Sequence, residues 1–314
     1  MSLIDIHAHF VTDSYVAAAR AAGIEHPDGM PAWATWSVVA HLDLMDRGDI
    51  AKAYLSISSP GVHFGDDEVA RTLAREVNEY GAVLRRENPD RFGHFASLPL
   101  PDVAGALDEA AYALDVLGAD GVVVETNAHG AYLGDERNEA LWAELDRRGA
   151  LVFVHPTSAP HVDDVSLGRP RPLVEFLFDT ARAASDLVFA RVLLRYPNIR
   201  WVLTHTAGVL PLLVDRMDTF RPVLLPEFAD DPSVREQLSG VWFDMAGTPF
   251  PRQVPAFAAA FGTDRLVYGS DYCWTPAGGA LAQIASVDEA DPPSSSQSWR
   301  ELTTRNAERL VSTR

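Results

Sequence analysis

Short runs of consecutive apolar residues recur along the chain, and most are followed by a longer stretch with helical periodicity. Apolar residues at consecutive positions are typical of parallel strands that are buried on both faces. We therefore predict eight strands, at Leu3–Ile6, Ala53–Ile57, Phe92–Leu98, Gly121–Glu125, Ala150–Val154, Ile199–Thr204, Val241–Asp244 and Arg265–Tyr268.

Four stretches between these runs place apolar residues every three or four positions, as one face of a helix does. Gly118 and Gly149 stand where two of these stretches end, in the position of a helix C-cap. The pattern predicts helices at Ala70–Arg86, Ala104–Leu117, Asn138–Arg148 and Val174–Arg195.

Strands that alternate with helices predict a closed (β/α)8 TIM barrel, formed by residues 1–314 as a single domain. The alternative is an open doubly wound sheet, but no strand is followed by the GxGxxG motif of that fold. Thr12–Thr35 is rich in loop-forming residues and is predicted to be an insertion after the first strand. Ala290–Gln297 is predicted to be a surface loop before a last helix, Trp299–Val311.

The composition of the chain excludes several classes of binding partner. The chain has 44 acidic and 26 basic residues and a net charge of −18, so it repels nucleic acid and anionic membranes. Cys273 is the single cysteine, which leaves no disulfide framework. We see no signal peptide and no apolar run of the ~20 residues that span a bilayer. These features predict a cytoplasmic protein that acts on a small molecule.

The candidate chemistry lies at the carboxyl ends of the predicted strands. His7 and His9 follow the first strand, and residues i and i+2 of a strand point to the same side. His155, His205 and Asp271 occupy the ends of three further strands. Barrel enzymes carry their active sites at this face, so we expect the five side chains to meet there.

Imidazole and carboxylate groups that leave one position open are typical ligands of a catalytic divalent metal. We expect one such ion, with Zn2+ favoured and Mn2+ as the alternative. The competing interpretation is that some histidines are buried and hydrogen-bonded for structure, and it applies most to His205. His63 and His129 also follow strands and could contact a substrate, although a surface or loop position is the favoured interpretation for both.

The motifs together resemble the amidohydrolase superfamily. They are His7-Ala8-His9, His155-Pro156, His205-Thr206-Ala207-Gly208 and Gly269-Ser270-Asp271-Tyr272. Within the superfamily, the chain is most similar to the branch that contains aminocarboxymuconate semialdehyde decarboxylase and the 6-methylsalicylate decarboxylases. The resemblance implies a metal-dependent, non-oxidative decarboxylase of a hydroxybenzoate-type acid such as 6-methylsalicylate.

The same resemblance implies a role for each residue. The metal ligands would be His7, His9, His155 and Asp271. His205 would move protons, and Asp271 would also deliver the proton to the ring. Arg216 matches an arginine that reaches the active site of a neighbouring subunit and holds a substrate carboxylate, which implies a homodimer. The alternative for Arg216 is an ordinary solvated position on a helix.

The sequence departs from the pattern of the semialdehyde decarboxylase at two positions, and a reaction other than decarboxylation is also compatible with the site residues. His41 and Asp43 stand where the semialdehyde decarboxylase has arginines, and one of those binds a carboxylate, so the substrate of that enzyme is not expected here. The same residues could instead convert a metal-bound water into a nucleophile, which would make the protein a hydrolase of a lactone or an amide.

Overall fold

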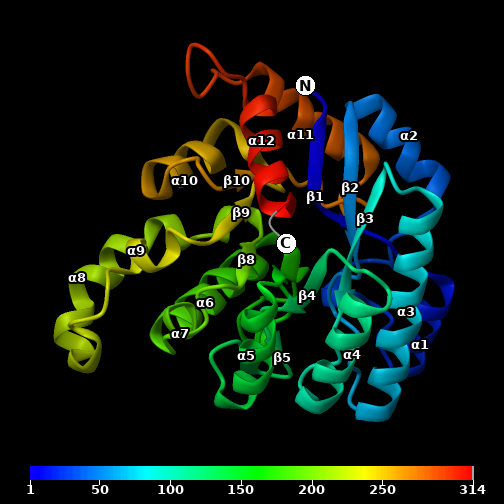
Figure 1. Ribbon diagram of the computed structural model, residues 1–314, viewed down its shortest axis with the longest axis horizontal. Coiled ribbons are helices and arrows are strands. Elements are labelled where there is room, and N and C mark those ends of the chain that lie inside the picture. The colour runs from blue at the N-terminus through cyan, green and yellow to red at the C-terminus, as the bar shows by residue number, and fades with distance from the viewer. Residues whose placement is uncertain (313–314) are drawn as a thin grey trace.

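Eight parallel strands form the core of the computed structural model, which describes residues 1–312 (Figure 1). Neighbouring strands pair in the order β1-β2-β3-β4-β7-β8-β9-β10. The ring nearly closes where Ile6 N donates to Tyr268 O at 2.9 Å. The predicted TIM barrel is therefore confirmed, and the open sheet is wrong. The strands are β1 (Leu3–His9), β2 (Ile50–Ser56), β3 (Phe92–Ser97), β4 (Gly121–Glu125), β7 (Leu151–His155), β8 (Arg200–Leu203), β9 (Trp242–Asp244) and β10 (Leu266–Val267).

Side chains from alternate strand positions fill the barrel and then line its mouth. Phe95, Val123 and Phe153 belong to one buried cluster inside the barrel. Because side chains two positions apart in a strand share a face, the next inward positions lie at the carboxyl end of each strand. These positions carry polar groups, namely Ser97, Glu125 and His155.

The predicted helices all form, with shifted ends. Val174–Arg195 divides into two helices because Arg191 adopts a left-handed conformation with φ of 56°. A short hairpin of β5 (Asn127–Ala128) and β6 (Ala131–Tyr132) follows β4. The helices are α1 (Asp13–Ala21), α2 (Val38–Gly48), α3 (Asp67–Glu87), α4 (Val103–Asp115), α5 (Glu139–Arg148), α6 (Glu175–Phe189), α7 (Val192–Arg195), α8 (Val214–Leu224), α9 (Val234–Leu238), α10 (Val254–Phe261), α11 (Ala277–Glu289) and α12 (Trp299–Ser312).

The insertion after β1 is more ordered than its composition suggested. It begins with α1, whose first turn is capped because Thr12 Oγ1 accepts a hydrogen bond from Tyr15 N at 3.1 Å. Loop structure resumes after this helix and continues up to α2, interrupted by one short 3-10 helix at Pro27–Gly29. No helix within residues 1–312 has both the length and the apolar composition that a bilayer crossing requires.

The C-terminal helix α12 closes the amino end of the barrel. It runs beside β1 (Figure 1). Ala307 and Leu310 are fully buried and belong to the same cluster as Ile6 and Phe153 inside the barrel. Asn306 Nδ2 donates to the carbonyl oxygens of Thr263 and Leu266, at 2.9 and 2.8 Å. The helix therefore acts as a plug: it fills the amino end of the barrel, opposite the carboxyl ends of the strands.

We expect Leu310→Ala to destabilise the barrel strongly, because truncation leaves a cavity among side chains that cannot collapse into it. Such substitutions cost about 2–5 kcal/mol in free energy of unfolding. Urea denaturation followed by circular dichroism measures the effect. Glu308→Ala, at an exposed position of the same helix, is the control and should stay within about 0.5 kcal/mol of the unmodified protein. Equal losses in both variants would contradict the plug.

Candidate metal centre

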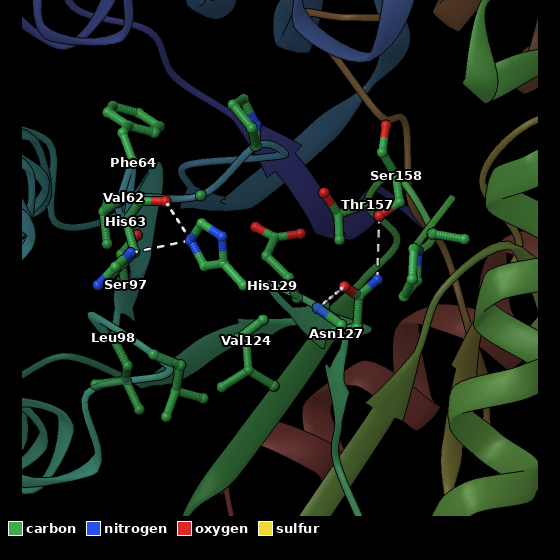
Figure 2. A pocket seen from close by; sticks show the side chains of 18 of the residues that line it. Val62, His63, Phe64, Ser97, Leu98, Val124, Asn127, His129, Thr157 and Ser158 are labelled. Atoms are coloured by element: carbon green, nitrogen blue, oxygen red, sulfur yellow. Dashed lines mark hydrogen bonds between the residues drawn. The ribbon is translucent and has the colours of Figure 1, made fainter. Parts of the chain in front are cut away.

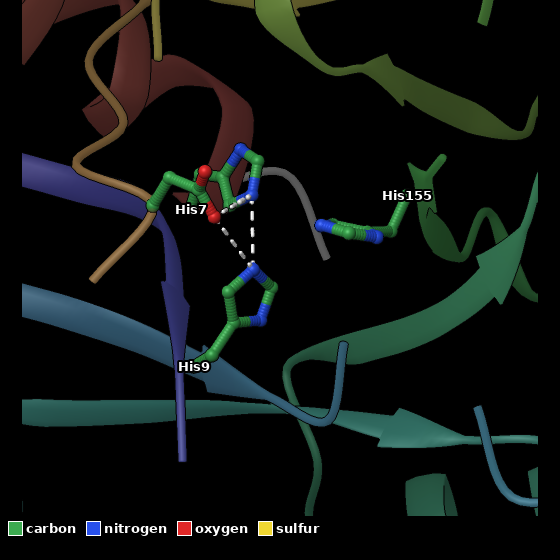
Figure 3. Close-up of side chains that lie close together, drawn as sticks. His7, His9 and His155 are labelled. Carbon is green, nitrogen blue, oxygen red and sulfur yellow. Dashed lines mark hydrogen bonds and ion pairs between the residues drawn. The ribbon is translucent and has the colours of Figure 1, made fainter. Parts of the chain in front are cut away.

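Four of the predicted side chains converge at the mouth of the barrel (Figure 3). His7 Nε2 lies 3.0 Å from His9 Nε2. These two nitrogens lie 3.4 and 3.3 Å, respectively, from Asp271 Oδ1. His155 enters from the end of β7, and one ligand atom from each of the four residues lies within 4.8 Å of all the others. The three histidines are buried.

These separations fit the ligands of a single cation. Two ligands about 2.1 Å from one ion lie about 3.4 Å apart in a tetrahedron and about 3.0 Å apart in adjacent positions of an octahedron. The distances among His7, His9 and Asp271 fall in that range. Three imidazoles and one carboxylate also form a donor set that suits Zn2+ and Mn2+. The residues present therefore fit one divalent metal ion.

The outer nitrogen of each histidine has a hydrogen-bonding partner, which orients the ring. His7 Nδ1 lies 2.8 Å from Asp244 Oδ2, and His9 Nδ1 lies 3.1 Å from Ser56 Oγ. His155 Nδ1 lies 2.7 Å from the carbonyl oxygen of its neighbour, Pro156. Such partners fix the tautomer of a ligating histidine and direct its Nε2 toward the metal.

Asp244 was not singled out from the sequence, although it also ends a predicted strand. Its Oδ1 accepts the backbone N–H groups of His205 and Ala246, both at 2.9 Å, while its Oδ2 faces His7. A carboxylate at the end of β9 therefore holds both β1 and the segment after β8. The rule that found the histidines, a polar residue at a strand end, would also have found Asp244.

His205 and Asp271 lie on the two loops that follow β8 and β10. Both have left-handed backbones, with φ of 53° and 57°. His205 Nε2 lies 3.7 Å from Asp271 Oδ2, so His205 stands beside the cluster rather than within it. Asp5 fixes the loop that carries Asp271, because its Oδ1 accepts the backbone N–H groups of His7 and Ser270 at 3.1 and 3.0 Å.

Charge at the site is divided between one histidine and two carboxylates. Burial alone would lower the pKa of His7, but the carboxylates of Asp244 and Asp271 raise it to about 10. Burial lowers the pKa of His9 and of His155. Burial opposes ionisation of Asp271, yet hydrogen bonds from His205, His7 and His9 hold its pKa well below the usual range. The carboxylates of Asp244 and Asp271 therefore favour the protonated form of His7.

A cavity of ≈ 360 Å³ opens beside the cluster and is lined by His155, His205 and Asp271. This volume is within the range of small-molecule sites. Apolar side chains such as Phe176 and Trp274 form part of its wall. No lysine or arginine is among the lining residues in the part of the chain that the structure describes. The cavity suits an aromatic ring but supplies no cationic side chain of its own.

The structure does not bring Arg216 to this cavity within one subunit. Arg216 lies on α8, which projects from the barrel (Figure 1), and its side chain is exposed. Its guanidinium group stacks over the Phe220 ring at 4.7 Å. His41 is also outside the cavity, since it is buried with its Nδ1 accepting from Trp36 Nε1 at 2.9 Å.

A second, larger cavity of ≈ 610 Å³ lies over the ends of β3 and β4 and contains His63 and His129 (Figure 2). His63 Nδ1 lies 3.0 Å from His129 Nε2, so the two rings satisfy each other. None of the five predicted site residues lines this cavity. Volume does not distinguish the cavities, since several exceed the one beside the four residues, whereas His155, His205 and Asp271 all line that smaller cavity.

Comparison with known proteins agrees with this geometry. The family profile described as Amidohydrolase matches residues 4–312. The decarboxylase yanB of Aspergillus niger is 35% identical over 297 residues, covering 88% of this chain and 78% of that protein. The 6-methylsalicylic acid decarboxylase acuB of Aspergillus aculeatus is 33% identical, covering 91% and 88%. A crystal structure described as an amidohydrolase is 32% identical with a TM-score of 0.92, covering 99% of this chain and all of that one.

We expect metal affinity to rise with pH because the metal must displace the proton from His7. With a His7 pKa of about 10 in the metal-free protein, the apparent affinity for Zn2+ should increase about tenfold per pH unit between pH 7 and 9. Asp244→Asn removes the larger of the two carboxylate contributions that raise this pKa and should flatten the slope. Competition with a chromophoric chelator measures both.

The control for this titration is Asp13→Asn, which changes one carboxyl group at an exposed position of α1. It should keep the slope of the unmodified protein. If Asp244→Asn kept that slope as well, the proposed control of His7 by Asp244 would be wrong.

Proposed function

Because the chain belongs to the amidohydrolase family, we propose that it is a metal-dependent carboxy-lyase. The reaction would release CO2, without oxidation, from a hydroxybenzoate-type acid such as 6-methylsalicylate. The observation that carries the proposal is the convergence of His7, His9, His155 and Asp271 beside a ring-sized cavity. Relatives named as decarboxylases over most of the chain favour this reaction over hydrolysis.

The proposed ligands of one divalent cation are the same four residues, with Zn2+ favoured and Mn2+ as the alternative. A bound cation would supply positive charge to the phenolate and carboxylate oxygens of the substrate. The cavity walls contributed by Phe176 and Trp274 would hold the ring and exclude water. Exclusion of water strengthens each electrostatic contact that the bound acid makes.

Decarboxylation requires a proton on the ring carbon that carries the carboxylate, and a positioned acid supplies it. We assign this transfer to Asp271, with His205 as the group that returns a proton to it. Their side chains lie 3.7 Å apart, and both line the cavity. Because His205 Nε2 lies 3.7 Å from Asp271 Oδ2, the carboxyl group would regain its proton from His205 in every cycle.

A partner subunit would supply the missing cationic side chain. We propose a homodimer in which Arg216 of one subunit reaches the cavity of the other and binds the substrate carboxylate. Two observations support this proposal. The cavity lacks a lysine or arginine of its own among the described residues, and α8 exposes apolar side chains that association would cover. These are Phe220, Val223 and Leu224.

The proposed cytoplasmic location rests on cysteine usage. The single cysteine, Cys273, is buried and unpaired, which suits a reducing compartment. The net charge of −18 makes nucleic acid and anionic membranes unsuitable partners.

The first test compares CO2 release with hydrolysis. Metal-loaded protein should release CO2 from 6-methylsalicylate or a related 2-hydroxybenzoate and should leave aryl esters, lactones and amides intact. Asp271→Asn should abolish CO2 release, and His205→Asn should reduce it about 100-fold, because each lacks one step of the proton route. Glu308→Gln, a surface variant on α12, is the control. Cleavage of an ester, lactone or amide without CO2 would contradict the proposal.

A second test addresses Arg216 by mixing subunits. Arg216→Gln and Asp271→Asn should each be inactive alone, because each damages a different half of the composite site. Unfolding and refolding the two together should restore about a quarter of normal activity, since half of the dimers are mixed and each has one intact site. Size-exclusion chromatography with light scattering establishes the dimer. Absence of recovery in a confirmed mixed dimer would show that Arg216 does not act across the interface.

A further inference from the structure

Trp274 brings an indole ring to the cavity beside the metal cluster, close to the proposed ligand Asp271. The backbone turns between the two residues, because Thr275 N donates to Asp271 O at 2.8 Å. Trp274, His205 and Asp271 all line the cavity. The indole ring therefore lies within one turn of the chain from the carboxyl group to which we assign the proton transfer.

The insertion after β1 restricts the position of this ring. Trp33, in the insertion, is buried and packs against Trp274 with ring centroids 6.0 Å apart. Trp33 Nε1 donates to Ile24 O at 3.2 Å, so the N–H group of this second indole has its own acceptor. Because close packing leaves a large ring little room to move, the Trp274 ring is oriented before a ligand enters the cavity.

The N–H group of Trp274 is buried and has no hydrogen-bonding partner among the residues that the structure describes. A buried donor without an acceptor costs free energy, so its presence calls for an explanation. His205 Nδ1 is also buried without a partner in this cavity. An imidazole nitrogen donates or accepts according to its tautomer, whereas an indole N–H group can only donate. Trp274 therefore requires an acceptor, which a ligand in the cavity can supply.

The carboxylate of a bound acid matches this donor. A carboxylate accepts about four hydrogen bonds and donates none, whereas a phenol hydroxyl both donates and accepts. No lysine or arginine lines the cavity within the described part of the chain. Within one subunit, neutral donors therefore have to bind the carboxylate oxygens that a metal ion leaves free.

We infer that Trp274 Nε1 donates a hydrogen bond to the carboxylate of the acid and thereby favours the acid over the phenol that remains after CO2 is lost. This inference rests on the proposed function and adds to it a substrate-binding residue that acts within one subunit, independently of Arg216. Loss of CO2 removes the acceptor and leaves the N–H group unpaired again. Because a site built to bind a polar group discriminates against a ligand that lacks it, the phenol binds more weakly than the acid.

The experiment compares two ligands that differ in the acceptor group. 3-Methyl-2-nitrophenol has two nitro oxygens in place of the carboxylate oxygens of 6-methylsalicylate and cannot release CO2, whereas 3-methylphenol lacks the group. Both are titrated into metal-loaded protein by calorimetry, and the KM for 6-methylsalicylate is measured by CO2 release. Trp274→Phe keeps an aromatic ring but removes the N–H group. It should lower the ratio of nitrophenol affinity to phenol affinity about fivefold and raise the KM about tenfold, because hydrogen bonds to charged acceptors are stronger.

Trp33→Phe is the matched control. It makes the same change in the other member of the ring pair, but the N–H group that it removes is bonded to Ile24 O. It should keep the affinity ratio of the unmodified protein. Each variant is compared with the same two ligands, so the difference in acidity between the ligands cancels. Thermal melting confirms that each variant is folded.

The outcomes separate this inference from the proposed function. CO2 release together with an affinity ratio that is unchanged in Trp274→Phe overturns the role of Trp274 and leaves the decarboxylase proposal intact. A ratio that falls in Trp274→Phe, without CO2 release by the unmodified protein, supports the binding role and overturns the decarboxylase proposal. A ratio that falls as much in Trp33→Phe as in Trp274→Phe, or binding of neither ligand, also overturns the inference.

Discussion

The paired contacts of one buried carboxylate, Asp244, organise the whole candidate site. One oxygen faces His7 Nδ1 at 2.8 Å, and the other accepts the backbone N–H group of His205 at 2.9 Å. Burial of a carboxylate without hydrogen-bonding partners costs free energy, so the buried position of Asp244 is stable only while both contacts are kept. The first strand and the loop after β8 are thereby held in one arrangement. The distances between the ligand atoms of His7, His9, His155 and Asp271 follow from that arrangement.

Closure of the barrel makes this arrangement available. Asp5 and Ser270 are separated by most of the chain, yet Asp5 Oδ1 accepts Ser270 N at 3.0 Å where β1 meets the end of β10. Asp271, the next residue, is consequently brought within 3.4 Å of His7. A slip between the two edges would move the carboxylate away from the histidines. The arrangement of the four residues therefore depends on the contacts that join β1 to the segment after β10, and α12 contributes to the site indirectly.

The part of the site that could be predicted from the sequence is the part that follows from strand periodicity. His7 and His9 are identified because two positions on one strand share a face, and His155 because parallel strand ends share an edge. Asp28, which lines the same cavity, could not be found in this way, because its place depends on a loop that is held by the hydrogen bond from Ser158 Oγ to Asp28 Oδ1. The proposed role of Arg216 would require a second subunit, about which strand periodicity carries no information. Local sequence patterns thus predict the site residues at the ends of the barrel strands, whereas long-range contacts determine which loop residues surround them.

The net charge of −18 and the lack of basic residues in the cavity wall together constrain how an anionic substrate is bound. A field of that sign slows the approach of an aromatic acid, so affinity has to arise at short range, after the acid has entered. A divalent cation held by the four proposed ligands would concentrate positive charge at one point of the wall. A single positive point would orient the acid, because the carboxylate would have only one favourable position. In a site with scattered positive charge, the ring could bind in several orientations, and the proton would not meet the correct carbon.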